Sequence, residues 1–326
     1  MTRTAQTAAE TTADLLVHRM TWEAEDVLSV ELVHPDGKPL PPWEPGAHVD
    51  LHLGGGLVRQ YSLCGDPQDT GRYRIGVLRE PASRGGSAHV HTKLRPGATV
   101  GVQGPRNHFA LVEAARYLFV AGGIGITPLL AMARQAGRLG VPWSMVYGGR
   151  RRASMAFAAE LAELAELPEP ASDTGELTLV PQDEHGLIDL DTLLADLPDG
   201  TAVYCCGPEP LIAAVEARCA AHTERFAAPK AAEPASGDSA FEVECRRSAR
   251  TVRVEPGRSV LDAVEDAGIT VLSSCRDGIC GTCETPVLEG TPDHRDFLLS
   301  DDERAAGGSM MICVSRARSG RLVLDL

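Results

Sequence analysis

Hydrophobic residues in the first third of the chain recur in short alternating runs, which is the pattern of half-buried β-strands. Turn signals such as Pro-Asp-Gly at residues 35–37 separate these runs. Short strands at regular spacing are typical of an antiparallel barrel, so we expect a β-barrel domain over residues 14–111. The runs lie at residues 27–33, 48–53, 73–78 and 99–102.

The rhythm changes in the middle of the chain, where apolar runs alternate with helical patterns. Strands that alternate with helices indicate a parallel sheet, so we expect an α/β domain over residues 112–226. The predicted strands lie at 117–121, 143–147, 177–180 and 202–206, and the predicted helices at 128–140 and 156–167.

The remaining segments complete a multidomain organisation. Residues 1–13 are polar and rich in Thr and Ala, and we expect a disordered N-terminal tail. Residues 227–239 are rich in Ala and Pro, which predicts a semi-stiff linker. Residues 240–326 form a further predicted domain, with a hairpin pattern followed by a helix that Ser259 can cap.

Composition narrows the possible functions. The 326 residues have room for two or three domains, and the hydrophobic fraction of 43% is sufficient for packed cores. The formal net charge of −14 argues against binding to nucleic acid or to an anionic membrane surface. No secretory signal and no stretch of membrane-spanning length is visible, which favours a reducing cytoplasm. In that compartment Cys64, Cys205, Cys206, Cys219 and Cys245 are expected to be free thiols.

Four other cysteines carry the strongest chemical signal. Cys275, Cys280 and Cys283 are spaced as C-x4-C-x2-C, and Cys313 follows some distance further on. This spacing is typical of a plant-type [2Fe–2S] site, in which four thiolates hold two irons. Four thiolates also suit zinc, but zinc sites usually contain two C-x2-C pairs. The sequence therefore favours an iron–sulfur cluster over a zinc-stabilised module.

Two turns in the α/β region are candidates for nucleotide binding. Gly122-Gly-Ile-Gly-Ile-Thr-Pro128 follows a predicted strand and opens a helix. Glycines there let the backbone approach a pyrophosphate that the helix N-terminus stabilises, although a merely tight turn has the same composition. Cys206-Gly-Pro208 ends a later strand, where ligands bind in α/β sheets or where the strand simply turns. The candidate residues are Gly122, Gly123, Gly125, Thr127, Pro128, Cys206, Gly207 and Pro208.

Two motifs in the predicted barrel are candidates for flavin binding. The segment Arg59-Gln-Tyr-Ser62 offers a guanidinium group, an aromatic ring and a hydroxyl, although a cation–π pair is the simpler interpretation. The loop Ser83-Arg-Gly-Gly-Ser87 has the composition of an anion nest or of an ordinary flexible loop. The candidate residues are Arg59, Tyr61, Ser62, Arg84, Gly85, Gly86 and Ser87.

These motifs occur together and in one order along nearly the whole chain. With Gly104-Pro-Arg-Asn107 they resemble the phthalate dioxygenase reductase family. The resemblance implies an FMN-binding barrel, a nicotinamide-binding α/β domain and a C-terminal [2Fe–2S] ferredoxin domain of β-grasp fold. Such proteins pass electrons from NADH through FMN and the cluster to an oxygenase. The 83–87 loop resembles the family's FMN-phosphate loop and favours FMN over FAD.

The resemblance also assigns individual roles. Phe226 resembles the aromatic residue that packs near the flavin, and its alternative role is a core anchor before the linker. Thr127 and Cys206 are the candidates for lining the hydride-transfer site, neither as an acid nor as a base. A nicotinamide gives up two electrons as a hydride and a cluster accepts one at a time, so a flavin must mediate between them.

A run of arginines at residues 150–152 bears on the choice of nucleotide. It follows the second predicted α/β strand, where the adenosine ribose would be bound, and relatives often carry a small hydroxyl residue where Arg151 stands. Arg150 is our candidate contact. Successive arginines can bind the 2′-phosphate of NADPH or form a solvated basic turn. From the resemblance we expect NADH, with NADPH as the alternative.

The predicted partner is a terminal oxygenase, either a Rieske-type non-heme iron enzyme or a cytochrome P450. A monomer that docks weakly through exposed acidic residues near the cluster is expected. The candidate acids are Asp293, Asp296, Asp301 and Asp302. The alternatives are a stand-alone flavin reductase with a small-molecule acceptor, and a redox sensor without catalytic activity.

Overall fold

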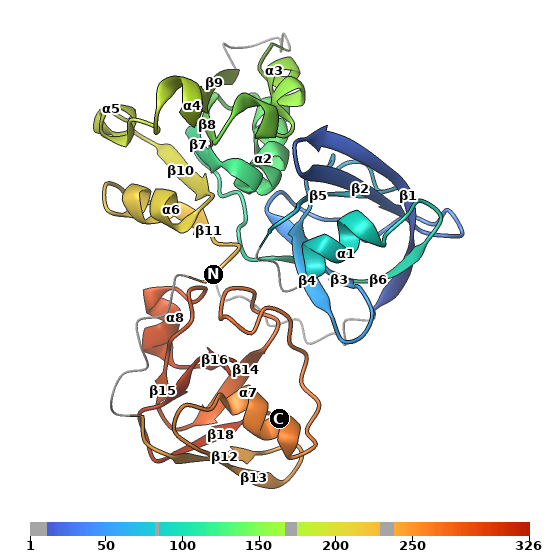
Figure 1. Cartoon of the computed structure of the whole chain (residues 1–326). Coiled ribbons are helices and arrows are strands. Elements are labelled where there is room, and N and C mark those ends of the chain that lie inside the picture. The colour runs from blue at the N-terminus through green and yellow to red at the C-terminus, as the bar shows by residue number, and fades with distance from the viewer. Residues whose placement is uncertain (1–11, 82–84, 167–174, 229–237) are drawn as a thin grey trace. The chain divides into compact units, whose positions relative to one another are not determined.

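The computed structural model describes residues 12–81, 85–166, 175–228 and 238–326. The chain divides into two compact units, Met1–Phe226 and Ala227–Leu326 (Figure 1). Most of the predicted tail 1–13 and of the predicted linker 227–239 lies outside the described residues. Among the described helices, none is both long and apolar enough to cross a membrane.

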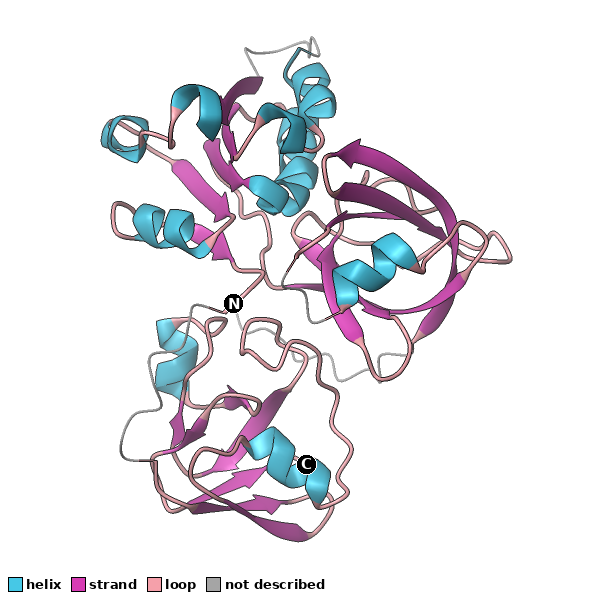
Figure 2. Cartoon of the chain, in the orientation of Figure 1, coloured by secondary structure: helices cyan, strands magenta, loops and turns pink. Residues whose placement is uncertain are grey.

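The first half of the larger unit is the predicted antiparallel barrel (Figures 1 and 2). Its sheet has the order β4-β3-β6-β1-β2-β5, and a bridge between Leu63 and Ile75 joins the end of β4 to β5. The elements are β1 (Ala13–Ala24), β2 (Val27–Val33), β3 (Ala47–His52), β4 (Val58–Ser62), β5 (Tyr73–Leu78), α1 (Gly86–Thr92) and β6 (Thr99–Asn107).

Alternation explains how these strands bury one face. In β3, Val49 and Leu51 are fully buried in the barrel core, together with Leu32 of β2 and Ile75 of β5. Strand β1 was not predicted, because the register of its pairing with β2 shifts at two places, which breaks the alternating pattern.

The second half of this unit is a parallel sheet with the order β11-β10-β7-β8-β9. Its strands are β7 (Arg116–Gly122), β8 (Trp143–Gly149), β9 (Gly175–Pro181), β10 (Thr201–Cys206) and β11 (His222–Glu224). The helices are η1 (Gly123–Gly125), α2 (Ile126–Arg138), η2 (Arg152–Ser154), α3 (Ala158–Glu166), α4 (Gln182–His185), α5 (Leu190–Ala195) and α6 (Glu209–Glu216).

Helices cover both faces of this sheet (Figure 2), so its central strand β7 is buried from Tyr117 to Gly122. In β7, Phe119 packs with α2, whereas Val120 packs on the opposite face with Ile212 of α6. The barrel and the sheet are tied together by Arg74 of β5, whose guanidinium lies 2.7 Å from the carboxylate of Glu160 in α3.

The smaller unit has the predicted β-grasp fold, a mixed sheet in the order β13-β12-β18-β14-β16 that packs on helix α7. Val260 and Val264 of α7 are fully buried against Val243 and Leu322 of the sheet. The elements are β12 (Phe241–Cys245), β13 (Arg250–Val254), α7 (Val260–Asp266), β14 (Glu284–Glu289), β15 (Pro292–Asp293), α8 (Asp301–Ala306), β16 (Ser309–Met311), β17 (Arg316–Ala317) and β18 (Arg321–Leu324).

Candidate cofactor sites

The two predicted nucleotide turns meet at the carboxyl edge of the parallel sheet. Strands β7 and β10 are neighbours, with Ala121 opposite Cys206. A Cβ atom added at Gly125 would lie 2.2 Å from the carbonyl oxygen of Cys206, and one added at Gly122 would lie 2.6 Å from Pro208. Only glycine allows this approach. The structure thus brings together Gly122, Gly123, Gly125, Cys206, Gly207 and Pro208.

The first turn of α2 is suited to an anionic ligand. Gly125 caps α2 without a side-chain hydrogen bond. The N–H of Ile126 donates to the carbonyl groups of Gly123 and Ile124 in η1, and the positive end of the helix dipole favours an anion at this turn. Pro128 lies in this first turn, as the sequence predicted for a helix start. A glycine cradle followed by a helix N-terminus without a side-chain cap fits the pyrophosphate of a nicotinamide nucleotide.

Thr127 lies where the barrel meets this turn. It is buried, and its hydroxyl donates to the carbonyl of Ile124 at 3.0 Å. Its methyl group would be 2.7 Å from a Cβ atom on Gly76, so it packs directly against β5. A role for Thr127 at the hydride-transfer site stays a prediction, but its hydroxyl already has a backbone partner.

Cys206 is fully buried at the end of β10. Burial, followed by the nearby Glu224 carboxyl, raises the pKa of its thiol well above the ordinary value. The thiol is therefore neutral at physiological pH. This agrees with a residue that lines a site rather than one that attacks a substrate.

A polar pair that the sequence analysis missed lies next to Cys206. In β11, Glu224 stands opposite Cys206, and the hydroxyl of Ser62 from β4 donates to its carboxyl group at 3.4 Å. Burial raises the pKa of Glu224 to about 8. Ser62 was a candidate from the sequence, whereas Glu224 was assigned no role.

The barrel candidates form a second cluster. The side chain of Arg59 lies over Gly86, because a Cβ atom there would be 2.3 Å from Arg59 Cγ. Gly85 has a φ of 92°, which favours glycine, and Ser87 accepts a hydrogen bond from the backbone of Glu80. A guanidinium group beside a glycine turn and a hydroxyl fits a flavin phosphate.

The aromatic candidates differ in burial. Tyr61 is half-buried, and burial raises the pKa of its phenol to about 12. Phe226 follows β11 and is 43% exposed, so the alternative of a core anchor does not apply. Ser83 and Arg84 lie outside the described residues, and their predicted roles at the phosphate stay predictions.

The three arginines after β8 have unequal surroundings. Arg151 Nη2 lies 2.6 Å from a carboxylate oxygen of Glu25, which is in the turn between β1 and β2. Arg152 makes two hydrogen bonds with the carboxylate of Glu184 in α4. For Arg150, the described residues provide no carboxylate partner. The run is thus largely neutralised by neighbouring acids.

In the smaller unit the four predicted metal ligands converge. The thiol of Cys275 lies within hydrogen-bonding reach of Cys280 and of Cys313, which in turn reaches Cys283. The backbone N–H of Asp277 donates to the Cys275 sulfur at 3.3 Å. Within the described residues, no three His, Cys, Asp or Glu side chains surround a point suited to a single metal ion. Four converging thiols with amide donors to sulfur fit a [2Fe–2S] cluster, which is held by four cysteine thiolates.

Comparison with known proteins agrees with these sites. The oxidoreductase NAD-binding domain family matches residues 119–217, and the 2Fe-2S iron-sulfur cluster binding domain family matches residues 243–318. Phenoxybenzoate dioxygenase subunit beta of Ectopseudomonas oleovorans is 46% identical over 96% of this chain and 97% of its own length.

Solved structures extend the similarity to the whole chain. Phthalate dioxygenase reductase, described as a modular structure for electron transfer from pyridine nucleotides to [2Fe–2S], is 36% identical over 97% of this chain and 98% of its own, with a TM-score of 0.68. The chain belongs to the phthalate dioxygenase reductase family. An intact type IV self-sufficient cytochrome P450 monooxygenase is 42% identical over 100% of this chain, with a TM-score of 0.87. The match spans 43% of that longer chain.

Membership in the phthalate dioxygenase reductase family confirms the resemblance predicted from the sequence motifs. Its members' sequences align with this chain across both compact units, so the barrel, the parallel sheet and the ferredoxin unit belong to one shared architecture. The roles of individual side chains stay predictions.

Replacing Gly125 by Ala tests the glycine cradle of this reductase. The added Cβ would overlap the Cys206 carbonyl, so we expect a loss of about 1–3 kcal/mol of stability and at least tenfold weaker binding of NAD⁺. Unfolding in urea and a nucleotide titration measure both. Gly137→Ala is the control, because its nearest neighbour would be 3.8 Å away. Unchanged nucleotide binding in Gly125→Ala would contradict the assignment.

Replacing Glu224 by Gln tests its raised pKa. The folded state holds this proton up to about pH 8, whereas the unfolded chain releases it near 4.5. Stability should therefore fall as pH rises from about 4.5 to 8, by up to about 1.4 kcal/mol per pH unit. Glu224→Gln should remove this part of the slope. Melting temperatures between pH 5 and 8 measure it, with the exposed Glu163→Gln as control; identical slopes in the wild type and Glu224→Gln would refute the shift.

Proposed function

We propose that this chain is the reductase component of an oxygenase system, which takes electrons from NADH and delivers them singly to a terminal oxygenase. The observation that carries the proposal is that one chain combines three sites. These are a glycine turn that fits a nucleotide, a cluster of barrel residues around Arg59 that fits a flavin phosphate, and four converging cysteines. When bound, FMN accepts a hydride and releases single electrons, and the [2Fe–2S] cluster carries those electrons.

The residues of the chain bind and orient these groups. Arg59 and the Gly85–Ser87 turn hold the FMN phosphate, with Tyr61 beside the ring system. The turn at Gly122–Gly125 holds the nucleotide pyrophosphate. Ser62, Cys206 and Glu224 form a neutral polar corner between β4 and the sheet edge, which suits a site where negative charge develops on the acceptor.

The electron acceptor is a protein rather than a small molecule. A small acceptor could take electrons from FMN directly, so a fused cluster domain has a purpose only if electrons must leave singly through it. Relatives include both a dioxygenase component and a cytochrome P450 monooxygenase. We keep both classes of oxygenase as candidates, and propose that the chain works as a monomer in the cytoplasm, where nicotinamide nucleotides are supplied.

The predicted docking acids need one correction. Asp296 has a fully buried side chain, so its predicted role in docking is wrong. Asp293 is paired with Arg295 and Arg318. Asp301 and Asp302, in the first turn of α8, remain exposed. A docking surface near the cluster therefore rests on these two residues.

The nucleotide selected is NADH. Arg151 and Arg152, which could bind a 2′-phosphate, are already paired with Glu25 and Glu184. A phosphate must compete with these carboxylates, and Arg150 alone adds little for an exposed contact. NADH carries no 2′-phosphate and meets no such competition.

The relay is tested with Cys280→Ala. The variant should lose the cluster and keep FMN, so reduction of ferricyanide by NADH should persist while reduction of cytochrome c falls at least tenfold. Iron content and the visible spectrum report the cofactors. Cys245→Ala is the control, because this buried thiol lies in β12, outside the cluster ligands. Full cytochrome c reduction without a cluster would support the stand-alone flavin reductase instead.

Nucleotide choice is tested with Glu25→Gln combined with Glu184→Gln. Releasing both arginines should raise kcat/KM for NADPH by about two- to fivefold, as expected for exposed ion pairs, and leave that for NADH unchanged. Glu163→Gln is again the control for surface charge. An unchanged ratio between the two nucleotides would show that these ion pairs do not determine the choice.

A further inference from the structure

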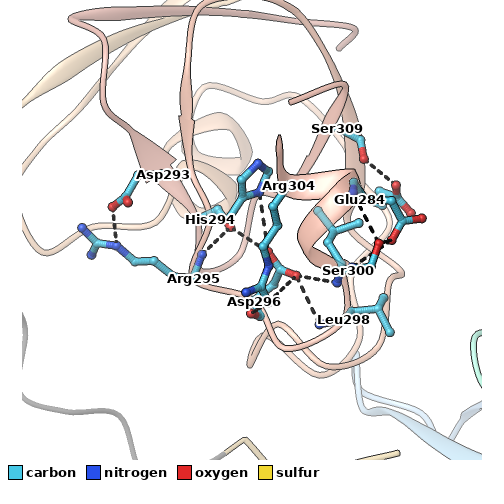
Figure 3. A network of polar contacts seen from close by, with 12 residues as sticks. Glu284, Asp293, His294, Arg295, Asp296, Leu298, Ser300, Arg304 and Ser309 are labelled. Carbon is cyan, nitrogen blue, oxygen red and sulfur yellow. Dashed lines mark hydrogen bonds and ion pairs between the residues drawn. The ribbon is translucent and has the colours of Figure 1, made fainter. Parts of the chain in front are cut away.

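A buried carboxylate lies behind the cluster loop. Asp296, labelled in Figure 3, is between β15 and α8 in the smaller unit. Its side chain is 0% exposed. Burying an ionised carboxylate is costly unless hydrogen bonds and a cation compensate for the lost water. The polar groups around Asp296 are therefore the first indication of its role.

These groups hold the carboxylate from several directions. Its Oδ2 accepts hydrogen bonds from the backbone N–H groups of Leu298 at 3.2 Å and Leu299 at 2.8 Å (Figure 3). The Ser315 hydroxyl lies 3.5 Å from Oδ1, and His294 Nδ1 lies 3.7 Å from the same oxygen. A carboxylate accepts several bonds at once, whereas an amide at this position would offer a single acceptor oxygen.

Arg304 supplies the compensating charge. Its Nη2 lies 3.8 Å from Asp296 Oδ2 and donates to the backbone carbonyl of Asp296 at 2.6 Å. Asp296 and Arg304 are thus a partly buried ion pair, in which each side chain offsets the field of the other.

Asp296 contacts both segments that carry the cluster ligands. In the loop between Cys275 and Cys280, Gly278 packs so closely that an added Cβ would lie 3.1 Å from Asp296 Cα. The backbone of Phe297 donates to the Gly278 carbonyl at 3.0 Å, and the Gly278 N–H donates to the Cys313 sulfur. On the other side, Ser315 is two residues beyond Cys313.

We propose that Asp296 is a positioning residue that fixes the cluster loop at Gly278, and that its buried negative charge lowers the midpoint potential of the bound [2Fe–2S] cluster. Reduction adds an electron to the cluster, and a nearby negative charge opposes this in a medium of low dielectric. Arg304 acts in the opposite direction. The proposal rests on the proposed function only in requiring that a [2Fe–2S] cluster is bound.

The test compares midpoint potentials of purified full-length variants in anaerobic redox titrations, followed by the visible and electron paramagnetic resonance spectra of the cluster. Asp296→Asn should retain the cluster and shift its potential to a more positive value. Arg304→Met should shift it to a more negative value. Asp293→Asn is the matched control, because it removes the same charge from a carboxylate that Arg295 and Arg318 already pair with near the surface; its potential should equal that of the wild type.

Opposite shifts in the two variants would support the proposal, since a purely mechanical role predicts no dependence on the sign of the charge removed. The proposal is overturned if Asp296→Asn leaves the potential unchanged or lowers it. If Asp296→Asn loses the cluster while Asp293→Asn keeps it, the positioning role is supported, and Arg304→Met then decides the effect of charge, which is overturned if its potential does not become more negative. If the wild type itself holds no [2Fe–2S] cluster, the proposed function fails, and that outcome is separate from failure of the role of Asp296.

Discussion

The approach of two backbones at the carboxyl edge of the parallel sheet is the constraint on which the nucleotide half of the molecule depends. Strands β7 and β10 are adjacent and in register, so the turn that leaves β7 must pass over the end of β10. Gly122 and Gly125 allow that passage because no side chain intervenes. The same passage places the first turn of α2 at this edge, where the positive end of the helix dipole favours an anion. The close approach of this turn to the end of β10 therefore determines both the packing of the two strands and the nucleotide site.

Burial makes the corner beside this turn neutral. Cys206 and Glu224 both have raised pKa values, because protein rather than water surrounds their ionisable groups. An ionised carboxylate would repel the negative charge that accumulates on an acceptor of hydride. A protonated carboxyl paired with Ser62 avoids that repulsion and still provides hydrogen bonds. Although the chain is acidic overall, the carboxyl group at this corner is uncharged and does not oppose the negative charge that develops on a hydride acceptor.

Local patterns predicted the architecture and the convergence of four cysteines, but not the contacts between distant segments. The cysteine spacing predicted four thiols that converge in the structure, because three of them lie in one loop. The glycine turn was recognisable because strand, turn and helix are contiguous. Glu224 was missed because its partner Ser62 is 162 residues away and belongs to the barrel. Asp296 was misjudged because acidic residues are usually exposed, and the backbone N–H groups that hold it inside are not visible in the sequence.

The acidic residues near the cluster therefore have separate roles. Asp296 faces inward and acts on the bound cluster, while Asp301 and Asp302 face solvent in the first turn of α8. That turn is already stabilised by a capping box between Ser300 and Glu303. Acidic residues at a helix N-terminus add about 0.3–1 kcal/mol, so Asp301 and Asp302 have a structural reason to be present without any partner. Salt weakens the long-range encounter between proteins more than it weakens the short-range interaction of these residues with their own helix, so the salt dependence of electron transfer distinguishes charge docking from helix stability.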